Sequence, residues 1–480
     1  MGLAVDSARR PGVRFVDARL LLPRVSETLV VRNGQAETLA HQEDRGIGIR
    51  VLRPRGWGFA ATSQLTRGAI RSCAHRAERL ARLAEGTRSS PAPWVEETRG
   101  PRNGRYATPV REDPFTVPIE RKLNLLREAE RAVHTGPRVK SGRASLSAFL
   151  DRKWYASSDG ASYQSTILQV GAGIEATAIG EGEVQRRSYP TSFGGDYAQG
   201  GFEFVSGLDL VSHAAECGHL AERLLTAPSC PRGRMDLVLS SDQLALQIHE
   251  SVGHATELDR VLGYEAGYAG TSFLYPRDRG SLRYGSEQMT IEADATIPGG
   301  LGTFPWDDEG VPGQRYPLVK EGRLVSFLSS RSSAGELGLS RSGGTARADG
   351  WARTPLVRMT NVNLPPGSRS VPDLLSEVRQ GIYLETNRSW SIDDKRLNFQ
   401  FGTEVGRLIR QGELRGYVRN PLYSGITPEF WGSLEARADA SSWHLWGIPN
   451  CGKGQPGQVG RVGHGAPWAL FRQVQVGGGS

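Results

Sequence analysis

The sequence predicts an α+β fold: an N-terminal α/β region, with a sheet flanked by helices, followed by a β-rich C-terminal domain with a twisted sheet or a barrel. Two observations support this fold class. Up to about residue 230, apolar stripes with helical spacing alternate with strand-like runs. Beyond Gly263 the chain is rich in Gly, Ser and β-branched residues, and short strands follow one another at turn-rich spacing. No repeat of fixed period is found.

In the N-terminal region, the predicted strands surround turn signals. Asn33-Gly34 is typical of a β-hairpin, and Ser158-Asp159-Gly160 marks a second tight turn. Thr66 is expected to cap the first long helix. We therefore expect a short helix at 17–22, strands at 28–31, 34–41, 46–52, 57–61, 139–151, 153–157 and 162–178, helices at 66–84, 119–134 and 209–226, and a Gly-rich loop at 194–201.

Changes of composition predict the domain boundaries. Pro228-Ser229-Cys230-Pro231 interrupts the chain and marks the main boundary. A Pro-, Gly- and Arg-rich connection over 87–118 marks a sub-boundary. The expected units are an N-terminal extension, residues 1–27, an α/β domain, residues 28–230, and a β-rich domain, residues 231–480. In the last unit, strands are predicted at 235–240, 289–294, 317–328, 356–361, 381–387, 398–411 and 413–418.

Composition excludes several classes of function. The net charge of +8 comes from dispersed Arg, without a basic run of the kind that follows a phosphate backbone, so specific nucleic-acid binding is not expected. No apolar stretch is long enough to cross a membrane. The four Cys show no paired spacing, which favours a reducing compartment. The sequence is that of a cytoplasmic protein.

The segment His249-Glu250-Ser251-Val252-Gly253-His254 carries the predicted chemistry. It follows an apolar, helix-like run at the start of the β-rich domain. Imidazoles bind zinc, and a neighbouring carboxylate can take a proton from a water that the metal activates. We therefore expect His249 and His254 to bind a metal and Glu250 to act as general base.

The spacing of the two His predicts an irregular helix. In a regular helix, residues five apart are rotated by roughly 140° and cannot reach one ion. The backbone must therefore widen to an i→i+5 turn, or end or kink at Gly253. We predict such an irregularity between His249 and His254.

A catalytic zinc site needs a third protein ligand and an open position. Cys451, in the Gly-rich segment Asn450–Gly457, is the best candidate, because a thiolate on a glycine-rich loop can approach closely. Lys453 is expected to help to keep the sulfur ionised. His464 and His444 are competing candidates.

These residues resemble a known family. H-E-S-V-G-H-A-T-E-L-D at 249–259, D-D-E-G at 307–310 and N-C-G-K-G-Q at 450–455 are similar to motifs of the TldD/PmbA metallopeptidases, also known as modulators of DNA gyrase. The N-terminal runs E-D-R-G-I-G-I-R-V at 43–51 and W-G-F-A-A-T at 57–62 fit the same family. The resemblance extends from about residue 30 to 475, with the motifs in the same order.

The resemblance implies a zinc peptidase with one zinc ion per chain. Carried over by position, His249, His254 and Cys451 would be the ligands and Glu250 the general base. The family's active forms pair two related chains, so a homodimer, or a heterodimer with a PmbA-type subunit lacking the metal motif, is implied. Its substrates are unfolded proteins and peptides, including precursors of peptide natural products.

Other acidic residues and other functions remain open. Glu257 and Asp259 follow the His motif and are expected to accept hydrogen bonds from the imidazoles. A ligand set of two His and one Cys with a Glu base also suits a deformylase-like amidase. A regulatory or binding subunit without catalysis is the second alternative.

Overall fold

The long strands of the N-terminal half form one curved sheet. The structure is a computed structural model that describes residues 1–87, 89–97, 102–268 and 270–478. Its first sheet has eight strands, in the order β3-β2-β1-β5-β6-β4, with β7 and β8 both paired to β6. These strands are β1 (Phe15–Arg32), β2 (Gln35–Leu52), β3 (Trp57–Thr62), β4 (Asn103–Ala107), β5 (Val139–Ser157), β6 (Ser162–Gly180), β7 (Glu183–Tyr189) and β8 (Asp196–Gln199).

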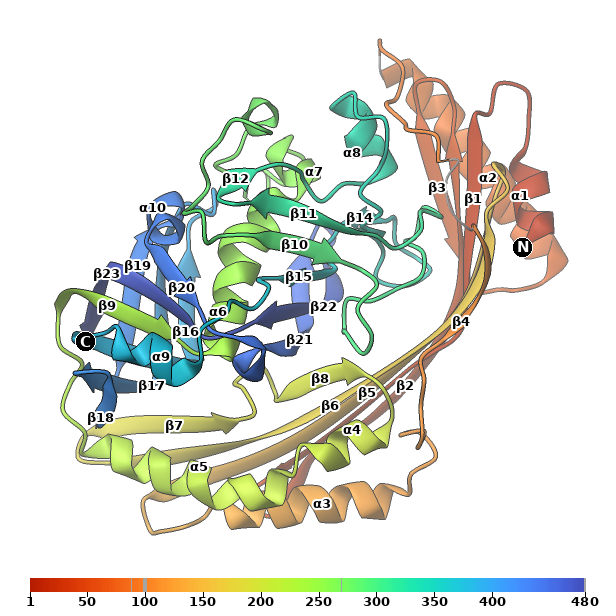
Figure 1. Cartoon of the computed structure of the whole chain (residues 1–480). Coiled ribbons are helices and arrows are strands. Elements are labelled where there is room, and N and C mark those ends of the chain that lie inside the picture. Colours follow the sequence, from red (N-terminus) through yellow and green to blue (C-terminus); the bar gives the residue numbers. More distant parts are fainter. Residues whose placement is uncertain (88, 98–101, 269, 479–480) are drawn as a thin grey trace.

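Helices cover the outer face of this sheet, and the C-terminal half lies against its inner, concave face (Figure 1). Helix α2 (Arg67–Ala84) begins at Thr66, whose side chain accepts a hydrogen bond from the Ala69 N–H, as the sequence predicts. Helices α3 (Ile119–Ala132) and α5 (Leu210–Leu225) pack their apolar stripes on β5 and β6. The short helices of this half are α1 (Gly2–Ala8), α4 (Phe202–Gly207) and the 3₁₀ turn η1 (Glu85–Thr87).

The C-terminal half contains a closed barrel of five strands. Strands β16, β9, β23, β19 and β17 pair in sequence, and β17 pairs again with β16. Strand β18 extends the sheet beside β17, and β20 pairs with β23. The bounds are β9 (Gly233–Leu239), β16 (Gln380–Ile392), β17 (Asn398–Arg410), β18 (Glu413–Val418), β19 (Pro421–Ile426), β20 (Leu434–Arg437) and β23 (Ala469–Gly478).

A six-stranded sheet, in the order β12-β11-β10-β15-β22-β21, lies beside the barrel. Helix α6 (Ser241–Ile248) follows barrel strand β9 and contacts β16 of the barrel and β22 and β21 of the sheet, so it lies between the two. The sheet comprises β10 (Ile291–Asp294), β11 (Arg315–Lys320), β12 (Arg323–Leu324), β15 (Asn361–Asn363), β21 (His444–Lys453) and β22 (Gln458–Ala466). Smaller elements are β13 (Ala346–Arg347), β14 (Leu356–Val357), α7 (Leu258–Val261), α8 (Arg331–Glu336), α9 (Val371–Ser376), α10 (Thr427–Gly432), η4 (Pro276–Asp278) and η5 (Ala440–Ser442).

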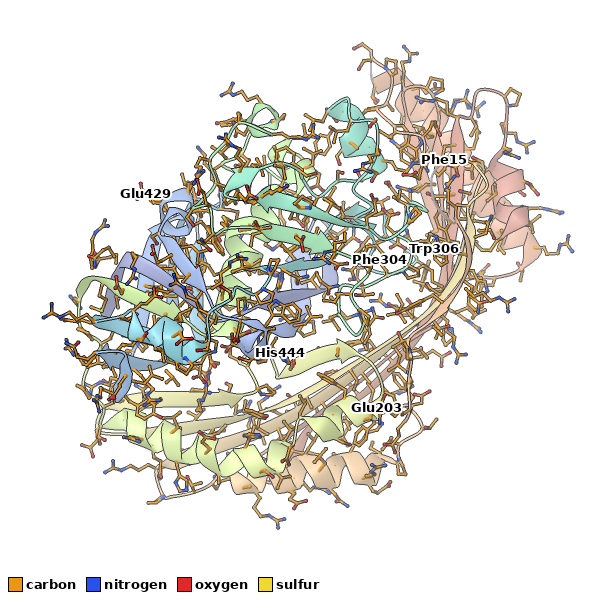
Figure 2. All side chains as sticks on the ribbon, in the orientation of Figure 1. Phe15, Glu203, Phe304, Trp306, Glu429 and His444 are labelled. Carbon is orange, nitrogen blue, oxygen red and sulfur yellow. The ribbon has the colours of Figure 1, made fainter. Side chains whose placement is uncertain are left out.

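Side chains from both halves meet across the inner face of the curved sheet. Trp306 stacks on Tyr163 of β6, with ring centroids 4.9 Å apart and planes 15° apart (Figure 2). The side-chain amide of Gln169 donates to the Leu301 carbonyl at 2.7 Å. His444 of β21 lies 2.7 Å from the buried Asp196 of β8. Because these contacts are distributed along the sheet, the two halves hold each other in a defined position.

The α+β class and the barrel-like C-terminal half are confirmed. The expected helix at 17–22 is wrong, because these residues belong to β1. Ala18 pairs there with Ile49 on one side and Ala156 on the other, and such distant partners override a weak local helix pattern. The expected extension at 1–27 thus contains the first half of a central strand.

Other corrections concern strands with distant partners. The break expected between 151 and 153 is absent, since β5 is continuous and pairs with β6 along its length. The connection at 87–118 contains β4, and the loop at 194–201 contains β8. Strands β7 and β19–β23 were not predicted. Among the described residues, no helix combines the length and apolar character that spanning a membrane requires.

A first prediction tests the core around α6. Trp431 is fully buried, and its Nε1–H donates to the Ser251 side chain at 2.9 Å. Replacing it with Ala removes about 3–5 kcal/mol of packing, so the thermal midpoint should fall by roughly 5–15 °C. Trp390→Ala is the control, because Trp390 is 50% exposed. Equal midpoints for the two variants in a thermal melt would contradict the described core.

Candidate metal centre

Helix α6 does not continue regularly through the His motif. Residues His249–Gly253 form a π-helical turn, in which the N–H of His254 donates to the carbonyl of His249. A 3₁₀ turn, His254–Thr256, follows. The predicted irregularity is confirmed, and of the two expected forms it is the i→i+5 turn. It brings the two imidazole rings to a centroid distance of 4.8 Å, nearly perpendicular to each other.

Gly253 is required at the end of this turn. A Cβ added there would lie 2.1 Å from the Met359 sulfur, far inside contact distance. Both Gly253 and Met359 are completely buried or nearly so, so neither can move into solvent. A side chain at position 253 would therefore have to displace the buried Met359, and glycine lets the helix pack closely against the segment that precedes β15.

The Cys451 side chain lies beside the two imidazoles. Its Sγ is 3.5 Å from His254 Nε2, and one donor atom from each of His249, His254 and Cys451 lies within 4.8 Å of the others. All three residues are buried. Cys451 belongs to strand β21, at an irregularity in its pairing with β22, and not to the expected glycine-rich loop. The strand supplies a rigid support that a loop would not.

A chain of hydrogen bonds sets the protonation of His249. His464 Nδ1 lies 3.0 Å from the Val362 carbonyl, which accepts only a proton donor, so Nδ1 carries the hydrogen. Burial and the neighbouring His249 hold the pKa of His464 well below its usual value, so its Nε2 is unprotonated. This Nε2 atom of His464 accepts a hydrogen bond from His249 Nδ1 at 2.8 Å. The other ring nitrogen of His249, Nε2, therefore keeps its lone pair.

The same logic applies to His254. Its Nδ1 lies 3.0 Å from the carboxylate of Glu257, which accepts the hydrogen bond and leaves Nε2 free toward Cys451. Burial would raise the pKa of Glu257, but Lys453 and His254 outweigh it, and the pKa is held well below the usual range. Glu257 thus remains ionised while it accepts the hydrogen bond from the ring.

Lys453 and Asp259 form the next contacts. The Lys453 ammonium lies 2.6 Å from Asp259 and 3.3 Å from Glu257, and it also donates to the Val357 carbonyl. Asp259 therefore contacts Lys453 and not an imidazole, which differs from the expectation. Lys453 and Arg260, whose Nε lies 3.6 Å from Glu257, together balance the two buried carboxylates.

Arg358 favours the thiolate form of Cys451. Burial would raise the pKa of this thiol, but the positive charge of the nearby Arg358 opposes burial, and the pKa lies below its usual value. Arg358 also donates to the Cys451 carbonyl, so it supports the strand as well as the charge. Sequence reasoning assigned this electrostatic role to Lys453 and missed Arg358, which carries no motif.

Glu250 is held by a second arginine that the sequence did not indicate. The Arg396 guanidinium lies 2.6 Å from the Glu250 carboxylate, which is 6% exposed. Arg396 lies in the turn between β16 and β17, with a φ of 62°. The pair is 146 residues apart in the chain, and the pairing of β16 with β9, the strand that leads into α6, places this turn on the same sheet as the strand before Glu250.

The competing candidates for a third donor, His464 and His444, are not part of the donor group. His464 contacts His249 as a hydrogen-bond partner, and the His444 side chain is 49% exposed and paired with Asp196. Among the described residues, one group of three or more His, Cys, Asp or Glu has the geometry to hold a metal ion, and it consists of His249, His254 and Cys451.

Comparison with known protein families gives three matches along the chain. Models of the PmbA/TldA metallopeptidase family match residues 24–81 as domain 1, residues 112–225 as the central domain and residues 232–478 as the C-terminal domain. The chain belongs to the TldD/PmbA metallopeptidase family. The resemblance of the His, Asp-Asp-Glu-Gly and Cys motifs is thereby confirmed.

Individual TldD/PmbA relatives match over nearly the whole chain. A metalloprotease of Methanothermobacter thermautotrophicus is 32% identical over 97% of this chain and 96% of its own. A metalloprotease TldD homologue of Haemophilus influenzae is 29% identical over 94% of this chain and 90% of its own.

Solved structures share the fold. TldE from Thermococcus kodakarensis has a TM-score of 0.71 and 16% identity, over 97% of both chains. A protein of Thermotoga maritima described as a candidate modulator of a DNA gyrase has a TM-score of 0.74 and 18% identity, over 97% of this chain and 96% of its own.

A second prediction tests the π-helical turn. Gly253→Ala places a methyl group against Met359 and should displace the turn, so the purified protein should hold far less metal than the wild type. The double variant Gly253→Ala/Met359→Ala should recover part of the lost metal content. Gly432→Ala in α10 is the control, since a Cβ there meets nothing within 4 Å. Full metal content of Gly253→Ala by elemental analysis would contradict this constraint.

Proposed function

We propose that this member of a metallopeptidase family is a zinc peptidase that hydrolyses peptide bonds in unfolded proteins or peptides. His249, His254 and Cys451 are assigned as the zinc ligands and Glu250 as the general base. The observation that carries the proposal is the convergence of two unprotonated imidazole nitrogens and one thiol with a lowered pKa in a single buried cluster.

The donor set suits zinc better than the hard cations. Calcium and magnesium prefer oxygen ligands, whereas two nitrogens and one sulfur are typical of catalytic zinc sites with a fourth position left open. The tautomers of His249 and His254 leave a lone pair on each donor nitrogen. The residues present therefore fit the ion that the family implies, with one zinc per chain.

The chain's own groups supply the proton transfers. A bound zinc ion would polarise the peptide carbonyl and make water a nucleophile near neutral pH. Glu250, next to His249, would serve as the proton acceptor for the attacking water and as the proton donor for the leaving amine. Arg396, 2.6 Å from the Glu250 carboxylate, holds it in place. Arg396 is thus a positioning residue for the general base.

Substrate and partner follow from the family and the fold. An extended, unfolded chain could bind through its backbone along an exposed strand edge, with little sequence preference. The similarity to TldE supports a pairing of two related chains, as a homodimer or with a PmbA-type subunit. We propose a cytoplasmic location, and peptide natural-product precursors as one class of substrate.

Glu250→Gln tests the catalytic assignment. The variant removes the proton acceptor but no ligand, so it should keep its zinc while cleavage of an unfolded peptide falls by roughly 10²–10⁴-fold. Glu429→Gln is the control, because Glu429 is exposed on α10 and remote in sequence from the cluster. Peptide fragments separated by mass spectrometry give the rate. Wild-type cleavage by Glu250→Gln would contradict hydrolysis by this route. Release of only a small acyl group by the wild type would favour a deformylase-like amidase.

Cys451→Ser tests the third ligand. Exchange of the thiolate for a hydroxyl removes the strongest zinc donor, so zinc content should fall from about one per chain to a small fraction, with loss of cleavage. Cys73→Ser serves as control, since Cys73 is buried in α2 of the other half. Unchanged zinc in Cys451→Ser, measured by elemental analysis, would remove Cys451 from the ligand set.

A further inference from the structure

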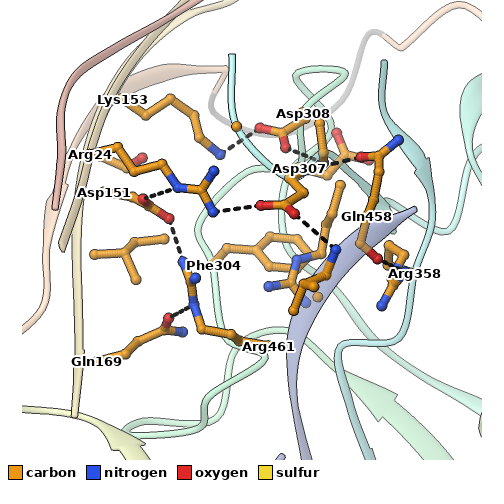
Figure 3. Close-up of a pocket in the computed structure, with 18 of the residues that line it drawn as sticks. Arg24, Asp151, Lys153, Gln169, Phe304, Asp307, Asp308, Arg358, Gln458 and Arg461 are labelled. Atoms are coloured by element: carbon orange, nitrogen blue, oxygen red, sulfur yellow. Dashed lines mark hydrogen bonds and ion pairs between the residues drawn. The ribbon is translucent and has the colours of Figure 1, made fainter. Parts of the chain in front are cut away.

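A small cavity lies between the curved sheet and the C-terminal half, behind strands β21 and β22. Its volume is about 60 Å³, and residues of β1, β5 and β6 face residues of β13 and β22 across it (Figure 3). Its walls carry five cationic side chains, which are Arg24, Lys153, Arg347, Arg358 and Arg461. The cavity is distinct from the three donor residues, which do not line it.

Three of the cations are balanced by carboxylates of the same walls. Arg24 lies 2.5 Å from Asp349, Lys153 lies 2.5 Å from Asp308, and Arg461 lies 2.5 Å from Asp151. The fourth carboxylate, Asp307, accepts hydrogen bonds from the backbone N–H groups of Glu309, Val311 and Ala346. The carboxylates are therefore already engaged.

Among the described residues, Arg347 and Arg358 form no ion pair with a carboxylate. Arg347 donates to the Met359 carbonyl at 3.0 Å and lies over the Phe304 ring. Arg358, 2% exposed, donates to the carbonyls of Cys451 and Gln458, and its Nε has no hydrogen-bond partner. Throughout the described residues, no carboxylate oxygen lies within 4.0 Å of a nitrogen of either side chain.

Two neighbouring guanidinium groups in such a place are costly. A buried charge without an ion-pair partner loses its hydration, which hydrogen bonds to carbonyls replace only in part. Burial and the proximity of Arg358 and Arg461 lower the pKa of Arg347 to about 10. An anion between the guanidinium groups would remove this cost, and the planar fork of Arg matches the oxygens of a carboxylate, sulfate or phosphate.

We propose that this cavity binds one small oxyanion between Arg347 and Arg358. A water needs about 10–15 Å³ of comparable space, so the cavity holds a few waters or one small polyatomic anion. The anion would fix the Arg358 guanidinium, which also donates to the Cys451 carbonyl. It would therefore support strand β21 at Cys451. The proposal does not depend on peptidase activity.

The test is a titration of the full chain with sulfate, followed by calorimetry, in a buffer free of other oxyanions. The wild type should bind one sulfate per chain, and Arg347→Gln should bind it at least ten-fold more weakly. Arg315→Gln is the matched control and should bind as the wild type, because Arg315 is 60% exposed and pairs with Glu292. Chelator-treated wild type should give the same affinity, which excludes binding to the metal.

Thermal stability without sulfate gives an independent readout. Because the Arg347→Gln variant lacks a buried charge that no carboxylate pairs with, its melting temperature should be equal to or above that of the wild type. Added sulfate should raise the melting temperature of the wild type only. Absence of saturable sulfate binding, equal binding by Arg347→Gln, or a lower melting temperature of this variant in sulfate-free buffer would each overturn the proposal.

Competition identifies the source of the anion. An N-acetylated peptide with a free C-terminal carboxylate that displaces sulfate, when its amidated form does not, assigns the site to a carboxylate of the substrate. If neither peptide displaces the bound sulfate, the site is assigned to a free inorganic anion.

Discussion

The hydrogen bond from the His254 N–H to the His249 carbonyl is the contact on which the centre depends. It widens one turn of a buried helix and brings together two imidazoles that a regular helix would turn apart. Such turns are rare, and this one is held by its surroundings: Gly253 fits against Met359, and the Ser251 side chain bonds Trp431. The core of the C-terminal half thus enforces a backbone geometry that local sequence alone would not maintain.

Each side chain of the centre has at least one partner that fixes its protonation state or its position. Val362 and His464 fix the tautomer of His249, while Glu257, supported by Lys453, fixes that of His254. Arg358 stabilises the Cys451 thiolate, and Arg396 holds the Glu250 carboxylate. These partners come from the six-stranded sheet, the barrel and the segment after α6. The centre therefore exists only when both C-terminal sheets are assembled.

The sequence predicted those features that depend on neighbours along the chain. The irregular turn follows from the spacing of His249 and His254, and the caps and hairpin turns follow from residues within a few positions. Residues 17–22 were assigned wrongly, because their strand is set by β2 and β5 and not by their own pattern. Arg358 and Arg396 carry no motif, and their roles arise from contacts 93 and 146 residues away in the chain. Cys451 lies in a strand where a loop was expected, because β21 pairs with the adjacent strand β22, where Gly460 is opposite Cys451, and the glycines of this hairpin suggested a loop.

The proposed centre requires that one sulfur and two imidazole nitrogens bind the same ion. X-ray absorption at the zinc edge of the zinc-loaded protein directly measures which atoms bind the ion and at what distances. The predicted spectrum has one sulfur at about 2.3 Å and two imidazole nitrogens at about 2.0–2.1 Å, with a light atom completing the shell. A first shell of nitrogen and oxygen without sulfur would contradict the assignment of Cys451 and with it the proposed centre.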